Sequence, residues 1–91
     1  MSPARHQLTL FVTGATHRSM RAVANVRSFC DQELAGDYSL EIVDLYQHPD
    51  RARASNVVVS PTLVRHGPKP VRLLIGDLSD RQQLLTRVKV A

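Results

Sequence analysis

The chain has a single cysteine, Cys30, and its position decides whether it could be reactive. Thiol redox enzymes need a thiolate at the N-terminus of a helix, usually in a Cys-x-x-Cys motif, because that environment lowers the thiol pKa. Cys30 instead falls late in a predicted helix among apolar residues, and the turn before that helix reads Thr13-Gly14-Ala15-Thr16. We therefore predict a core cysteine without redox chemistry. A lone cysteine forms no internal disulfide, which suits a reducing cytoplasm.

Histidine, serine and glycine also fail to form a chemical motif. The four histidines, assigned here to the N-terminal lead and to loops, are His6, His17, His48 and His66. They form no i,i+4 pair and have no cysteine cluster nearby, whereas a metal site needs three or four converging ligands. Ser60 lacks the Gly-x-Ser-x-Gly context of a nucleophile elbow, and no glycine-rich phosphate loop is present. We expect a binding protein rather than an enzyme, with no catalytic residue, metal or cofactor.

The charge of the chain favours some partners over others. Twelve Lys and Arg against eight Asp and Glu give a net charge of +4, and ten of the twelve basic residues are arginine. Arginine pairs with carboxylates and phosphates, so a solvated surface, an acidic protein partner and nucleic acid all remain open. The chain has only four aromatic residues and no run of basic residues, and both observations weigh against a nucleic-acid partner. No apolar stretch approaches the roughly 20 residues of a membrane span, so we expect no membrane partner.

The 91 residues predict one small domain. Alternating or continuous apolar runs predict strands, and a 3.6-residue stripe formed by Ala22, Val23, Val26, Phe29, Cys30 and Leu34 predicts a helix. In chain order, we expect a flexible lead at 1–6, a strand at 7–13, a helix from about 19 to Gly36, a strand at 39–45, a short helix at 50–55, β-type runs at 57–64 and 71–75, and a last helix from 79.

The order βαβαββα is that of a thioredoxin-like α/β fold. In this arrangement a cis proline begins the third strand, and Pro61 falls at that place. We therefore predict a cis Ser60–Pro61 bond. Ser79, followed three residues later by Gln82, predicts a capping box at the start of the last helix. Leu84, Leu85 and Val88 should form the buried side of that helix.

Six phrases of the sequence resemble the KaiB family, in order and nearly without gaps from about residue 8 to residue 85. They are Leu10-Phe11-Val12-Thr13-Gly14, Ser19-Met20-Arg21-Ala22, Ile42-Val43-Asp44-Leu45, Ser60-Pro61-Thr62-Leu63, Pro70-Val71-Arg72 and Ile75-Gly76-Asp77-Leu78-Ser79-Asp80-Arg81. The last phrase, spaced correctly from Ser-Pro-Thr-Leu, is the most specific. The thioredoxin-like sensor domain of SasA-type histidine kinases is a looser relative.

The resemblance implies a protein without catalytic activity that binds a KaiC-like ATPase in a circadian clock or in a simpler stress or timing system. A KaiA-like protein and a histidine kinase are further partners that it implies. The family is metamorphic: one form is thioredoxin-like and binds the partner, whereas the other is βαββααβ and usually a tetramer. The fold-determining residues on this interpretation are Pro61, Gly76, Asp77, Ser79, Arg87 and Lys89.

Arg87 and Lys89 favour the thioredoxin-like form. Clock members carry a glycine and an aspartate in the corresponding stretch of the last helix. Replacing glycine within a helix stabilises it by about 0.8–1 kcal/mol, and a cation suits the last turn better than an anion. Two folds of one metamorphic chain differ by only a few kcal/mol. We therefore predict the thioredoxin-like form, as a monomer or dimer rather than a tetramer.

The resemblance also implies a set of partner-binding residues. Arg21, on the polar side of the first helix, and Arg72, which alternates with Val71 and Leu73, match the family. Ser39, Glu41 and Asn56 stand where alanine and two lysines are common. The expected partner-binding residues are Arg21, Arg72, Arg65, Asn56 and Glu41. Asp44, Asp77 and Asp80 are expected to hold turns rather than to bind a partner.

Overall fold

Strand β1 runs through the interior of a four-stranded sheet in the computed structural model, which describes residues 4–90. The order is β2-β1-β3-β4, with β1 parallel to β2 and antiparallel to β3, and β3 antiparallel to β4. The strands are β1 (His6–Val12), β2 (Tyr38–Asp44), β3 (Thr62–Gly67) and β4 (Arg72–Ile75). β2 and β4 are therefore the two edges of the sheet.

Helix α1 (His17–Glu33) makes the crossover between the parallel strands β1 and β2. Its N-cap is Thr16, whose Oγ1 accepts a hydrogen bond from the backbone N–H of Ser19 at 3.2 Å. At the other end the Leu34 N–H donates to the Cys30 carbonyl, and Gly36 turns the chain with a φ of 74°. The predicted apolar stripe lies against the sheet, with Val23 only partly buried.

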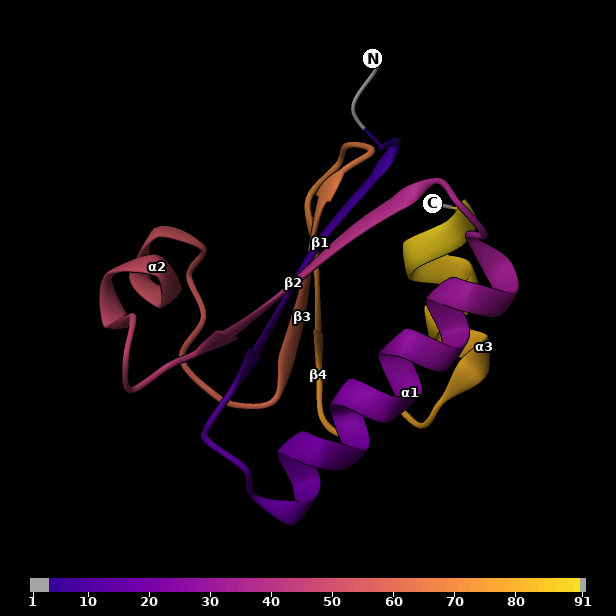
Figure 1. Ribbon diagram of the computed structural model, residues 1–91. Coiled ribbons are helices and arrows are strands. Elements are labelled where there is room, and N and C mark those ends of the chain that lie inside the picture. Colours follow the sequence, from indigo (N-terminus) through magenta and orange to yellow (C-terminus); the bar gives the residue numbers. More distant parts are fainter. Residues whose placement is uncertain (1–3, 91) are drawn as a thin grey trace.

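The two faces of the sheet are covered unequally (Figure 1). α1 and the C-terminal helix lie on one face, where Leu8, Leu10, Leu63 and Leu74 form the larger core with them. Helix α2 (Pro49–Ala54) lies on the other face, over a smaller core of Phe11, Val43, Ala52, Val57 and Val64. β1 is thus buried on both faces near Phe11, as its sequence predicts. On the α2 face, edge strand β4 stays exposed.

The C-terminal helix has two parts, α3 (Arg81–Leu84) and a π-helical segment, η1 (Leu85–Val90). Leu84 and Val88 are buried against the sheet and Leu85 is partly buried, which confirms the predicted apolar side. Lys89 donates to Glu33 of α1 at 3.0 Å, whereas Arg87 is exposed. No helix among residues 4–90 has the length and apolar character needed to cross a membrane.

The element order and the cis Ser60–Pro61 bond match the predictions from sequence. Three local predictions are wrong. His6 is buried as the first residue of β1, because strand pairing extends further than the hydrophobic alternation suggested; residues 1–3 of the predicted lead lie outside the described part. Residues 57–61 precede β3, because Pro61 has no N–H to donate to the sheet. The N-cap of α3 is Asp80, not Ser79, because the Asp80 carboxylate accepts from the Gln83 N–H at 3.1 Å.

Candidate functional site

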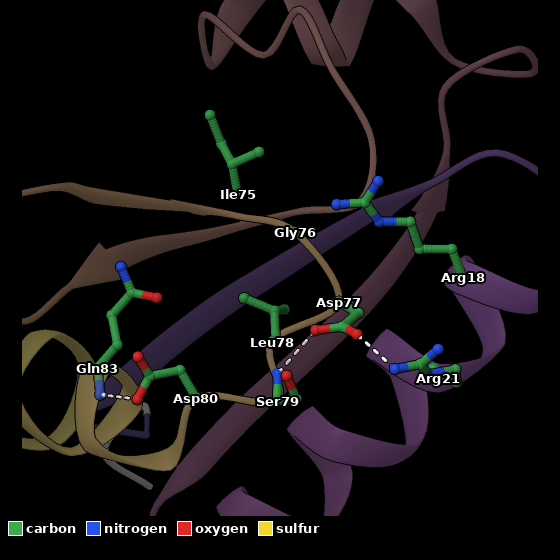
Figure 2. A pocket seen from close by; sticks show the side chains of 9 residues that line it. All are labelled: Arg18, Arg21, Ile75, Gly76, Asp77, Leu78, Ser79, Asp80 and Gln83. Atoms are coloured by element: carbon green, nitrogen blue, oxygen red, sulfur yellow. Dashed lines mark hydrogen bonds and ion pairs between the residues drawn. The ribbon is translucent and has the colours of Figure 1, made fainter.

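A surface hollow of about 310 Å³ lies between the N-terminal half of α1 and the turn that joins β4 to α3. Figure 2 labels the nine residues that line it. Arg18 and Arg21 approach from the helix, whereas Asp77 and Asp80 belong to the turn. The turn is the segment of the sequence that most specifically resembles the KaiB family.

The turn holds its shape through two backbone conformations and one buried side chain. Gly76 has a φ of +117°, a region that residues with a Cβ rarely adopt. Leu78 has a φ of 61°, and its side chain is 5% exposed within the main core. The Asn25 side chain of α1 donates to the Asp77 carbonyl at 2.8 Å. The turn is thereby attached to both the core and α1.

The Asp77 carboxylate connects the turn to the arginines (Figure 2). One oxygen accepts from the Ser79 N–H at 3.1 Å, and the other accepts from Arg21 Nη2 at 2.7 Å. Hydrogen bonds from Ser79, followed by the charges of Arg21 and Arg18, lower the pKa of Asp77. Asp77 therefore stays ionised and orients Arg21, as expected for a residue that holds a turn.

Arg18 is the second arginine of this hollow, and it is exposed. Its Nη2 lies 3.7 Å from the position that a Cβ on Gly76 would occupy, so the guanidinium lies beside the glycine backbone. Within residues 4–90 it makes no ion pair, whereas Arg21 pairs with Asp77 while keeping 54% of its side chain exposed. Two exposed guanidiniums therefore lie one helical turn apart. They can bind carboxylates of another molecule, each with several donors.

Arg65 is not part of this surface, and its predicted partner-binding role is wrong for this fold. Its side chain is 0% exposed and donates to the Val88 carbonyl at 3.3 Å and to the Pro70 carbonyl at 2.6 Å. Burial, with a contribution from the neighbouring charge of Arg72, lowers the pKa of Arg65. Arg72 lies opposite Arg65 in the strand pairing and is half-buried, and its buried Nε has no hydrogen-bond partner in the described part of the chain.

Glu41 and Asn56 lie elsewhere, so the five predicted residues do not form one site. Glu41 of β2 accepts two hydrogen bonds from Arg51 of α2, one of them at 2.6 Å from Arg51 Nη1. Asn56 is exposed after α2, with a φ of 59° that asparagine tolerates better than most residues. Sequence analysis missed Arg18. Its spacing of three residues from Arg21 was the available signal, because residues three apart share a helix face.

The remaining chemical candidates have structural environments. Burial, together with the nearby charge of Asp31, raises the pKa of Cys30 to about 12, so its thiol is protonated and unreactive at neutral pH. Asp44 accepts from the N–H groups of Gly14 and Tyr46 and holds a turn. His66 lies on β3 rather than in a loop and bonds to Thr9 at 3.0 Å. Among the described residues no three His, Cys, Asp or Glu side chains are grouped as metal ligands.

This sheet, with a first turn that lacks cysteine, defines a thioredoxin-like domain without the redox motif. Solved structures support the fold. Mitochondrial thioredoxin 3 of Saccharomyces cerevisiae superimposes with a TM-score of 0.76 at 16% identity, over 94% of this chain and 78% of that one. The N-terminal domain of Synechococcus elongatus SasA gives 0.72 at 24% identity, over 100% of this chain and 96% of the domain.

Sequence comparison identifies the family. The KaiB domain model matches residues 9–90. The circadian clock protein KaiB3 of a Synechocystis species is 36% identical over 85 residues, which are 93% of this chain and 83% of KaiB3. The circadian clock oscillator protein KaiB of Prochlorococcus marinus is 42% identical over 86 residues, 93% of this chain and 72% of that protein. The chain belongs to the KaiB family and has a thioredoxin-like fold.

Proposed function

We propose that this protein is a non-enzymatic regulator that binds a KaiC-like ATPase in a circadian clock or a related timing or stress system in the cytoplasm. The observation that carries the proposal is the pair of exposed arginines, Arg18 and Arg21, beside the turn of the family-specific sequence 75–81. The docking surface comprises this pair, the turn and the adjacent end of β4.

Electrostatics supports an acidic partner surface. The chain has a net charge of +4, and Arg21 is already oriented by Asp77, which reduces the conformational freedom that it would lose on binding. Arg18 brings a guanidinium without an ion pair among the described residues. Charged groups at the edge of an interface increase the association rate and specify the partner. Binding should therefore weaken as salt is added, because exposed charges are screened over about 8–10 Å.

The test is a titration of the cognate KaiC-like ATPase in each nucleotide state, followed by calorimetry or a pull-down. Arg18→Ala and Arg21→Ala should each weaken binding about tenfold, as is typical when an interface arginine is truncated. Arg27→Ala is the matched control, because Arg27 is also exposed on α1 but lies outside the hollow. If all three variants bind like wild type, the assigned surface is wrong. If the wild type binds in no nucleotide state, the proposed function fails.

One observation favours a second candidate. The superposition on the SasA N-terminal domain covers the whole of this chain and nearly all of that domain. The fold is therefore also compatible with a sensor module of a two-component histidine kinase. The same titration against the cognate histidine kinase, and against a KaiA-like protein where one exists, separates these possibilities. Binding to the kinase without binding to the ATPase would favour the sensor module.

A further inference from the structure

A second surface hollow, of about 440 Å³, lies on the face of the sheet that carries α2. Thr9 of β1 lines it and points to the same face as Phe11, because alternate side chains of a strand share a face. Phe11 belongs to the smaller core under α2, so the hollow continues that face toward the start of β1. It shares no lining residue with the hollow beside α1.

The base of this hollow is a polar pair held by the sheet. Thr9 is 3% exposed, and its Oγ1 lies 3.0 Å from Nε2 of the half-buried His66. The pairing of β1 with β3 shifts at this place, so that His66 and Gly67 together lie opposite Gln7. Such bulges redirect side chains and are frequent next to active sites. Within residues 4–90 the Nδ1 of His66 makes no hydrogen bond, so one ring nitrogen holds the side chain and the other can bond to a ligand.

One charge of each sign lines the wall of the hollow. Two nitrogens of Arg51, on α2, donate to the two carboxylate oxygens of Glu41, on β2. The hydrogen bonds and the charge of Arg51 lower the pKa of Glu41, so both groups are ionised at neutral pH. The side chains of Arg51 and Glu41 are 41% and 52% exposed, and their pairing leaves further Arg51 N–H groups and Glu41 lone pairs unused.

These groups narrow the class of ligand that fits. Among the described residues, no Phe, Tyr or Trp lines the hollow and only Ala4 and Leu8 are apolar, so it suits neither a stacked ring nor an apolar molecule. No three potential metal ligands are grouped in the described part of the chain. A simple anion would meet Glu41 as well as Arg51. A small molecule that carries both charges meets an opposite charge for each.

We propose that this hollow binds a free α-amino acid. The ligand carboxylate bonds to the unused N–H groups of Arg51, and the ligand ammonium bonds to the unused lone pairs of Glu41. The two charges of an α-amino acid sit on groups joined by one carbon, so they match the two adjacent charges of the pair without separating it. Ser39, Gln7 and His66 line the same hollow and bond to a polar side chain of the ligand.

The open position of the Glu41–Arg51 pair limits the affinity. Exposed ion pairs each contribute little, because water competes for both groups. We therefore expect a dissociation constant of about 1 mM, which added salt should raise. Because Arg51 belongs to α2 and Glu41 to β2, a bound amino acid bridges the short helix and the edge of the sheet. The bound ligand should therefore reduce local opening of α2, which hydrogen exchange measures.

The first test is a titration of the isotope-labelled full chain with glycine, followed by NMR. The amide signals of residues 9, 39–41, 51 and 66 should shift and saturate, whereas those of residues 75–81 should not. N-acetylglycine lacks the ammonium and glycinamide lacks the carboxylate, so each should bind about tenfold more weakly than glycine. The absence of a saturable shift with glycine, or equal binding of either analogue, would overturn the proposal.

The second test uses variants of the pair. Glu41→Gln and Arg51→Met each remove one charge and should weaken glycine binding about tenfold. An exposed pair contributes little to stability, so both variants should fold. Arg53→Met is the matched control, because Arg53 is exposed on the same helix but does not line the hollow. Glycine binding that survives either pair variant, or that falls equally in Arg53→Met, would overturn the proposal. The titrations contain no ATPase, so they are independent of docking at the hollow beside α1.

Discussion

At the N-terminal end of the C-terminal helix the supporting groups are exposed, whereas at its C-terminal end the main one is buried. Asp80 caps α3, and Asp77 pairs with Arg21 on the surface. At the end of η1, Arg65 donates to the Val88 carbonyl from a position that is 0% exposed. Lys89, which pairs with Glu33 nearby, is 44% exposed. The acidic N-cap Asp80 therefore lies at the start of the helix and the cations Arg65 and Lys89 lie near its end, as the helix dipole favours, although Arg81 adds a cation to the first turn.

This difference separates groups that can serve a partner from groups that serve only the fold. Exposed charges keep unused hydrogen-bonding capacity and can exchange partners at little cost. A buried guanidinium has lost its hydration and depends on the carbonyls that replace it. The proposed docking surface consequently lies at the N-terminal end of the helix, and the C-terminal end should respond to mutation mainly through stability.

Among the substitutions at the two ends of the C-terminal helix, those of Arg65 should give the largest loss of stability. Arg65→Ala removes the donors of the Val88 and Pro70 carbonyls and leaves a cavity, so we expect a loss of about 2–4 kcal/mol in the free energy of unfolding. Arg65→Met fills much of the volume without a buried charge and should lose about half as much. Urea denaturation measures both. A loss below about 1 kcal/mol for Arg65→Ala would contradict the role of Arg65 in holding η1.

Substitution of Gly76, in the turn that precedes α3, should give the next largest loss of stability. An alanine would have to keep a φ near +117°, which costs about 1–3 kcal/mol of stability. The strain would be in the backbone, because the added Cβ would meet Arg18 at an ordinary 3.7 Å. Gly67→Ala is the control, since its φ is not positive and its new contacts begin at 3.5 Å. Equal unfolding free energies for the two variants would show that the turn is not conformationally demanding.

Asp80 and Ser79 distinguish the observed cap from the predicted one. Asp80→Ala should destabilise the chain by about 1 kcal/mol, because the Gln83 N–H loses its acceptor. Ser79→Ala should cost less than half of that. Asp80→Asn keeps an acceptor and loses the charge, so its unfolding free energy isolates the contribution of the helix dipole. A larger loss from Ser79→Ala than from Asp80→Ala would restore Ser79 as the cap.

The sequence predicted the order of elements because periodicity reports which face of each element is buried. The sequence also predicted the cis bond at Pro61 and the apolar faces of α1 and of the C-terminal helix. It did not predict that Arg65 is buried, although Leu63 and Arg65, two residues apart, share one face of β3. Arginine is almost never fully buried, so composition outweighed the period of two. The carbonyls that accept from Arg65 come from Pro70 and Val88, and only the tertiary fold brings them together.

The candidate site was predicted in part for a similar reason. Arg21 and the Asp77 turn were identified because they lie in sequence segments that resemble the family. Arg18 lies outside those segments and was missed. Asp80 and Ser79 are both suitable caps, and the choice depends on where Leu78 enters the core. Glu41 and Asn56 were grouped with the arginines by resemblance, but the fold places them beside α2.

Substitution of Glu33 should give the smallest change in stability, and this change should depend on pH. Glu33 of α1 bonds to Arg81 at the start of α3 and to Lys89 near the end of η1. Hydrogen bonds from Lys89 and then Arg81 lower the pKa of Glu33, so its ionised form stabilises the folded state. This contribution is complete above the ordinary glutamate pKa of about 4.3 and is lost as pH falls through the lower folded value. Thermal unfolding of wild type and Glu33→Gln should therefore differ at about pH 6 and converge toward about pH 3. A difference that stays constant over this range would show that the ion pairs do not carry the effect of Glu33.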